Sequence, residues 1–255
     1  MATQPLLHYL SVPLPTIGQQ DTVPGRNTMN LRYGPDDISE VVPWPEFSYD
    51  TIIHRYGVVL NQQQIQPDPF DFPPRPIRDE PMFTLRCSDL IFNRIRRALH
   101  ATFQFLRPQL NVLRLSEVSL DGGSSAEIID QFRPDIAFSV IGGSYATNPN
   151  RAPGDLKVSW KWRSSMHFER NPLLRTGYFQ VLAQVNFYMM QHGARHGAIL
   201  TDKEFVAVKR LDANGRIAVS ESILWSGGGE GRLSVLMGLW YLGMLSAEDE
   251  NWALQ

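Results

Sequence analysis

Cysteine is almost absent from the chain, which limits both its redox and its metal chemistry. Cys87 is the single cysteine among 255 residues. A single cysteine cannot form a disulfide within the chain, and it cannot build a zinc site from several cysteines. The histidines are scattered, and His167, His192 and His196 lack the HxxxH spacing of a helical metal site. We therefore expect no metal centre built from cysteine or histidine.

Long apolar runs are also missing. Nothing in the sequence approaches the ~18 consecutive apolar residues needed to cross a bilayer. The opening MATQPLLHYLSVPLPT lacks the basic start and the long apolar centre of a secretory signal. We therefore expect an intracellular protein, in the nucleus or the cytoplasm, with no membrane partner.

The chain has little net charge, −2, but the charge is unevenly distributed. Residues 86–114 carry six arginines against Asp89, and residues 151–175 carry six basic residues against Asp155 and Glu169. Two basic blocks in an otherwise acidic chain indicate an anionic ligand such as nucleic acid. Solvated helix faces would give the same pattern.

Residues 1–82 contain 13 of the 18 prolines. Proline removes a backbone donor and disfavours helix before it, so this part is expected to be extended and rich in turns. Its aromatic residues and the run GVVL argue against a plain linker. We expect an N-terminal extension over 1–82 that packs on the core or contacts a protein partner or a second copy. Residues 83–255 are expected to form the main domain.

From about residue 84 the apolar spacing predicts a regular order of elements. It predicts helices over 87–106, 173–191 and 232–245, and strands over 111–120, 133–141, 154–162, 196–200, 205–210 and 217–225. The short turn at Thr201–Glu204 joins two of these strands as a hairpin, whereas the earlier strands are separated by longer connections. The sequence therefore predicts an α/β domain with a mixed central sheet flanked by helices.

The predicted strand at 154–162, GDLKVSWKW, alternates completely. Successive side chains on a strand point to opposite faces, so Asp155 and Lys157 share one face. Trp160 and Trp162 are expected in the core on the other face. The alternation predicts a half-buried strand.

Two predicted strands bring acids to their polar faces, Asp135 after Pro134 and Asp155 before Lys157. Carboxylate oxygens suit Mg²⁺, and a lysine beside the ion could position or help deprotonate a bound water during phosphodiester hydrolysis. A structural interpretation competes with this one. Asp135 could cap a turn, Asp155 and Lys157 could form an exposed pair, and Gln184 could lie on a solvated stripe.

These residues resemble the signature of the PD-(D/E)XK nuclease superfamily. Pro134-Asp135, a nineteen-residue spacer and Asp155-Leu156-Lys157 match its short motif. Its restriction-endonuclease-like core has the order αβββαβ, which is also the order predicted above. The stretch QVNFY, from Gln184 to Tyr188, resembles the QxxxY element of RecB-type members, whose two residues share a helix face. The combination is similar to fungal members of the superfamily.

The resemblance implies a role for each matched residue. Asp135 and Asp155 would bind Mg²⁺ or Mn²⁺, with the carbonyl of Leu156 as a third ligand. Lys157 would assist the attacking water, and Gln184 and Tyr188 would support the site or contact the nucleic-acid backbone. The substrate would be nucleic acid, DNA in preference to RNA. From their charge alone, Lys161 and Arg163 are expected to bind its phosphates.

The chain departs from the family pattern at the first helix, which usually adds an acid. No glutamate lies in 87–106, so Asp89 is the candidate there, with Glu117 on the next strand as a substitute. Two hypotheses therefore stay open: a metal-dependent nuclease, or a catalytically weakened module of the same fold that binds nucleic acid or a protein. A third is a protein-interaction domain led by the proline-rich N-terminus.

Overall fold

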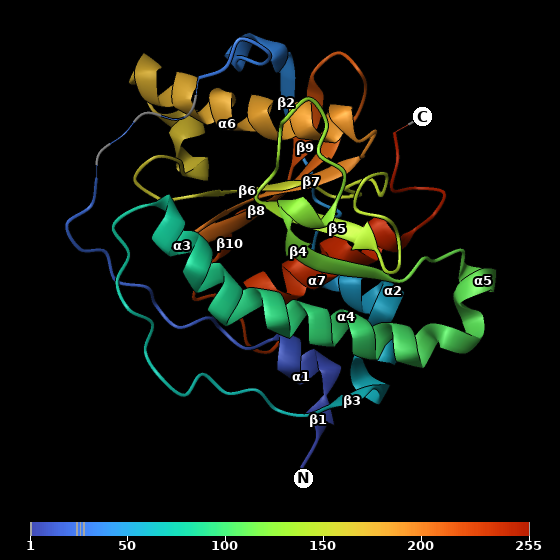
Figure 1. Ribbon diagram of the computed structural model, residues 1–255. Helices are drawn as coiled ribbons and strands as arrows, with labels where there is room; N and C mark the ends of the chain where they lie inside the picture. The colour runs from blue at the N-terminus through green and yellow to red at the C-terminus, as the bar shows by residue number, and fades with distance from the viewer. Residues whose placement is uncertain (1, 24, 26, 28, 255) are drawn as a thin grey trace.

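A computed structural model of the chain, which describes residues 2–23, 25, 27 and 29–254, has a β-sheet at its centre with helices on both faces (Figure 1). In this described part the sheet has eight strands, in the order β2-β9-β8-β7-β6-β5-β4, with β10 paired to β8. The pairs β2–β9 and β6–β7 are parallel and the others antiparallel. The strands are β2 (Glu40–Pro43), β4 (Val118–Gly122), β5 (Ile136–Val140), β6 (Gly154–Lys157), β7 (His196–Thr201), β8 (Glu204–Arg210), β9 (Arg216–Val219) and β10 (Ile223–Leu224). The predicted α/β class with a mixed central sheet is confirmed.

The two faces of the sheet are covered differently. One face carries α6, whose apolar residues form a core with the side chains of β7 and β8. The helices of the other face share a larger core with the rest of the chain (Figure 1). The helices are α1 (Leu6–Leu10), α2 (Tyr49–Gln62), α3 (Glu80–Cys87), α4 (Asn93–Leu106), α5 (Leu110–Leu113), α6 (Pro172–Gln191) and α7 (Val235–Ala247). None of the helices in the described ranges is long and apolar enough to cross a bilayer.

The strand predicted over 154–162 is shorter and more buried than expected. β6 ends at Lys157, and all four of its residues are buried because β5 and β7 flank it and helices cover both faces. A turn follows, in which the amides of Lys161 and Trp162 donate to the carbonyl of Val158. Trp162 therefore lies in the α6 core, stacked on Tyr178 with ring centroids 5.8 Å apart, and not on the opposite face. Trp160 is only half-buried.

The first helix begins earlier than predicted. Instead of starting at residue 87, helical backbone runs from Glu80 through a π-helical segment, Ser88–Phe92, into α4. The Asp79 side chain caps it by accepting a hydrogen bond from the amide of Met82 at 3.0 Å. Pro81 fits in the first turn, where a missing amide costs nothing, so it does not delay the helix.

Two other predicted strands also differ from the structure. Most of the segment 111–120 is not strand, because α5 occupies its start and Arg114 then takes a left-handed backbone with φ of 52°. β4 begins only at Val118. The predicted strand 217–225 is divided into β9 and β10.

The N-terminal 82 residues are more regular than their proline content suggests. They contain α2, capped by the Ser48 hydroxyl, and β2, which extends the main sheet by pairing with β9. A separate two-stranded sheet joins β1 (Gln4–Pro5) to β3 (Gln64–Ile65). Leu6, Leu10 and Ile17 belong to the larger core. The extension therefore shares its core with the rest of the chain, and residue 82 lies inside α3.

Close contact between α6 and β7 positions the helix over the sheet. A Cβ atom on Gly197 would lie 2.8 Å from the Pro153 carbonyl, 2.9 Å from Val185 Cγ1 and 3.0 Å from Met189 Sδ. We expect Gly197→Ala to lower the free energy of unfolding by about 1–3 kcal/mol, because α6 would have to shift. The matched control is Gly122→Ala, since a Cβ there meets nothing within 4 Å. Denaturant unfolding of both variants tests the contact, and equal stabilities would contradict it.

Candidate active site

A buried ion pair on the central strand is the core of the candidate site. Lys157 Nζ lies 2.6 Å from Asp155 Oδ2, and the two side chains are 5% and 3% exposed. They share one face of β6, because they are two residues apart. That face is toward α6, whose Gln184 contacts Asp155. Leu156, between them, points into the opposite core. The interpretation as an exposed surface pair is therefore wrong.

Two residues of α6 support the carboxylate of this pair. Gln184 Nε2 donates to Asp155 Oδ1 at 3.2 Å and also lies 3.0 Å from the hydroxyl of Tyr188. Both α6 residues are buried and lie one turn apart, as their spacing predicts. The predicted solvated stripe does not exist at this position.

Asp135 completes a group of two carboxyls. It immediately precedes β5, and its Oδ2 accepts a hydrogen bond from the amide of Leu156 at 2.8 Å. Its charge also raises the pKa of Asp155, so the two carboxyls lie close together. Asp135 is only partly buried, so it forms the more accessible side of the group. Any role of the Leu156 carbonyl stays a prediction.

Burial and the two charged neighbours set the protonation of the pair. Burial, and then Asp135, raise the pKa of Asp155 to about 7 against the lowering effect of Lys157. Burial alone would lower the pKa of Lys157, but the charge and hydrogen bond of Asp155 outweigh it and raise that pKa. Lys157 is therefore a cation at neutral pH, whereas Asp155 changes its protonation state close to neutral pH.

Glu80, at the start of the first helix, is an acid close to the charged lysines that sequence reasoning missed. Its carboxylate lies 3.4 Å from Lys161 Nζ, and its charge also raises the pKa of Lys157. Asp89 is not near the group, since it pairs with Arg86 and its side chain is 65% exposed. An aspartate followed by an acid and a proline is a helix-start signal, so the sequence did contain the clue.

The remaining predicted residues have different surroundings. Glu117 pairs with Arg107 at 3.6 Å. Lys161 lies in the turn after β6 and is bound to Glu80, whereas Arg163 is exposed. The turn itself is held by the buried carboxylate of Asp202, which accepts a hydrogen bond from the amide of Ser159 at 2.7 Å.

The two carboxyls have the donor chemistry of a magnesium or manganese site. Asp155 Oδ2 is buried and, apart from the nearby ammonium, receives no directed hydrogen bond in the described part of the chain. Mg²⁺ usually takes one or two carboxylates and keeps several waters, which suits Asp135 and Asp155. The described residues contain no group of three or more acidic, histidine or cysteine side chains placed to hold an ion.

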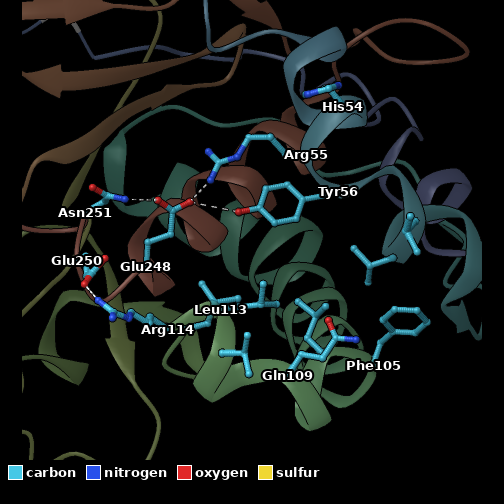
Figure 2. Close-up of a pocket in the computed structure, with 15 residues that line it drawn as sticks. His54, Arg55, Tyr56, Phe105, Gln109, Leu113, Arg114, Glu248, Glu250 and Asn251 are labelled. Carbon is cyan, nitrogen blue, oxygen red and sulfur yellow. Dashed lines mark hydrogen bonds and ion pairs between the residues drawn. The ribbon is translucent and has the colours of Figure 1, made fainter.

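A large cavity lies elsewhere in the molecule. It has a volume of about 810 Å³ and is lined by α2, the end of α4 and the C-terminal segment (Figure 2). Its two arginines are already paired, Arg55 with Glu248 and Arg114 with Glu250. Since these ion pairs neutralise its arginines, the cavity is a weaker candidate for a catalytic site than the buried carboxyl pair.

Comparisons of the chain with family models, with curated proteins and with solved structures gave no match. The function therefore has to be argued from the site itself.

The raised pKa of Asp155 predicts a pH dependence of stability. Its ordinary value is 3.8, so the stabilisation from the bound proton is complete below that pH and is lost as the pH rises to about 7. Relative to Asp155→Asn, the free energy of unfolding should fall across this window, by at most about 1.4 kcal/mol per pH unit, and then level off. Denaturant unfolding without divalent metal measures it. A difference that stays flat, or rises, would contradict the assigned direction.

Proposed function

We propose that this chain is a metal-dependent nuclease of the PD-(D/E)XK superfamily that hydrolyses phosphodiester bonds, with DNA preferred over RNA. Asp135 and Asp155 bind Mg²⁺ or Mn²⁺, Lys157 assists the attacking water, and Gln184 and Tyr188 hold the group in place. The helix followed by β4, β5, β6, α6 and β7 has the αβββαβ order of the restriction-endonuclease-like core, which supports this assignment.

The observation that carries the proposal is the buried pairing of Asp155 with Lys157 beside a second carboxyl. Removing two charges from water costs several kcal/mol per ion, and such pairs add little net stability. Perturbed acids and bases of this kind concentrate at functional sites. The α6 glutamine that supports Asp155 adds to this argument, because it fixes one carboxylate oxygen.

The protonation states define what these residues do in hydrolysis. Water attacks phosphorus as the bond to the leaving oxygen breaks, and the proton that the water loses passes to bulk solvent, which protonates the leaving oxygen. Lys157 is a cation, so it donates hydrogen bonds to the water or to a phosphate oxygen and does not accept that proton. A bound Mg²⁺ supplies Lewis-acid stabilisation of the charge on the phosphate. Glu80 is the acid contributed by the first helix.

The described donor set also supports a second function. It lacks a preformed group of three acidic ligands, and Glu80 is engaged by Lys161. A module of the same fold that binds nucleic acid without cutting it needs only the basic surface. Binding without metal-dependent cleavage would favour this function over the nuclease.

Cleavage of labelled DNA and RNA in Mg²⁺ or Mn²⁺ tests the proposed activity. Asp155→Ala should lower the rate by more than about 100-fold, and Glu80→Gln by about 10–100-fold, because each changes an acid of the site. Asp89→Asn is the matched control on the same continuous helix, and it should cleave like the parent. Equal losses in Glu80→Gln and Asp89→Asn, or full activity in Asp155→Ala, would refute the assignment.

Binding of nucleic acid should depend on the turn after β6. Replacing Lys161 and Arg163 with alanine removes two positive charges, so the salt slope of duplex binding should fall by up to about 1.8. Stability should change by no more than about 1 kcal/mol, since both charges are at least partly exposed. Arg107→Ala with Arg114→Ala removes the same charge from the α4–α5 region and is the control. An unchanged salt slope for the Lys161 and Arg163 variant would exclude this turn as the binding surface.

A further inference from the structure

An extended segment near the N-terminus passes over the elements that carry the candidate site. It lies between two buried residues, Ile17 at 1% and Tyr33 at 4% exposure. We call its described residues, 18–23, 25, 27 and 29–32, the strap. None of these described residues is buried. The strap is therefore held by polar contacts and not by burial of apolar side chains.

The first part of the strap binds the turn after β6 and the start of α3. Gln19 Nε2 donates to Asp202 Oδ2 at 2.7 Å and to Ser159 Oγ at 2.9 Å. The amides of Gln20 and Val23 donate at 3.1 Å to the carbonyls of Ile77 and Arg78, which lie before Asp79, the cap of α3. The Val23 carbonyl accepts a hydrogen bond from Trp160 Nε1 at 3.2 Å.

The second part of the strap joins this turn to α6. Asn27 Nδ2 donates to the carbonyl of Lys161 at 3.3 Å and to that of Gly177 at 3.2 Å. Gly25 lies so close to Lys161 that a Cβ atom there would be 3.2 Å from Cε. In Figure 1 the N-terminal chain runs past the start of α3 on its way to α6. The strap therefore contacts α6, the turn after β6 and the segment before α3, which adjoin the residues Gln184, Lys157 and Glu80.

The anchor at Tyr33 lies beside the buried carboxyl. Its ring packs on Phe187 of α6 with centroids 5.3 Å apart. Burial, and then the charge of Asp155, raise the pKa of its hydroxyl. With the chain in this arrangement Asp155 is 2% exposed and Lys157 is 4% exposed. A phosphodiester cannot reach these groups in this arrangement, and the strap occupies the turn after β6, where Gly25 lies against the side chain of Lys161.

We propose that the strap is an autoinhibitory cover, which must lift from the turn after β6 before nucleic acid can reach Asp155 and Lys157. This inference rests on the proposed nuclease function. Segments held by a few exposed hydrogen bonds open at much lower free energy than a packed core. Nucleic acid that binds only the open arrangement would shift the population toward it.

A disulfide between the strap and α6 tests the proposal directly. A Cβ atom on Gly177 would lie 3.5 Å from Asn27 Nδ2, so side chains at these two positions meet, and Asn27→Cys with Gly177→Cys is the pair to oxidise, with bond formation checked by mass spectrometry. Cys87 is fully buried and does not compete. The oxidised variant should retain less than about a tenth of the parent cleavage rate, and reductant should restore it. Gly177→Cys alone, treated identically, is the control. Full cleavage by the oxidised, cross-linked protein would overturn the proposal.

A matched pair of glutamines tests release of the strap. Gln19→Ala removes a hydrogen bond to the Asp202 carboxylate, which is worth about a factor of ten in the opening equilibrium. Gln20, its exposed neighbour, contacts Ile77 through its backbone amide, so Gln20→Ala keeps this bond and is the control. Cleavage should rise by up to about tenfold in Gln19→Ala only. Identical rates in the two variants would contradict the autoinhibitory role.

Amide hydrogen exchange separates failure of the strap from failure of the nuclease. If the parent protein shows no cleavage that depends on Asp155, the nuclease function is refuted. Even then, hydrogen exchange at the amides of Gln20 and Val23 still measures opening of the strap. They should exchange at least about tenfold faster than those of β6, faster again in Gln19→Ala, and slowly in the oxidised disulfide variant. Exchange as slow as in β6 in every variant would show a fixed structural segment and overturn the proposal.

Discussion

The ion pair between Asp155 and Lys157 is the constraint on which the rest of the site depends. Both side chains are almost fully buried, and burying charges costs several kcal/mol unless further hydrogen bonds satisfy them. Gln184 provides such a bond to the carboxyl side of the pair, whereas the charge of Asp135 raises the pKa of Asp155. Because each partner comes from a different element, β5, β6 and α6 must keep a fixed arrangement for the pair to exist.

The fold provides that arrangement through close packing at the centre of the sheet. β6 lies between an antiparallel and a parallel neighbour, so its register is fixed on both sides. The close approach of α6 to Gly197 brings the glutamine within reach of the carboxylate. The same burial that makes the pair electrostatically strong hides it from a polymeric substrate. A movable strap resolves this conflict between a dry site and access to it.

The sequence contained most of the fold and of the candidate site, for physical reasons. Two-residue and four-residue periodicity placed Asp155 with Lys157 and Gln184 with Tyr188 on common faces, because these are properties of local backbone geometry. Other features depended on tertiary context. Burial of β6 on both faces follows from its neighbours, and the position of Trp162 follows from a turn that the alternation concealed. Glu80 was missed because the helix was predicted to begin at residue 87, although an aspartate cap followed by a first-turn proline favours an earlier start.

Anomalous diffraction from crystals soaked in Mn²⁺ tests most directly whether Asp135 and Asp155 bind a metal ion. We predict one strong peak between the carboxylates of Asp135 and Asp155, with the ammonium of Lys157 displaced from Asp155 Oδ2 but still beside it. The peak should disappear in Asp155→Asn, while the fold is retained. Manganese bound only at surface sites, with the ion pair between Asp155 and Lys157 intact, would contradict the account.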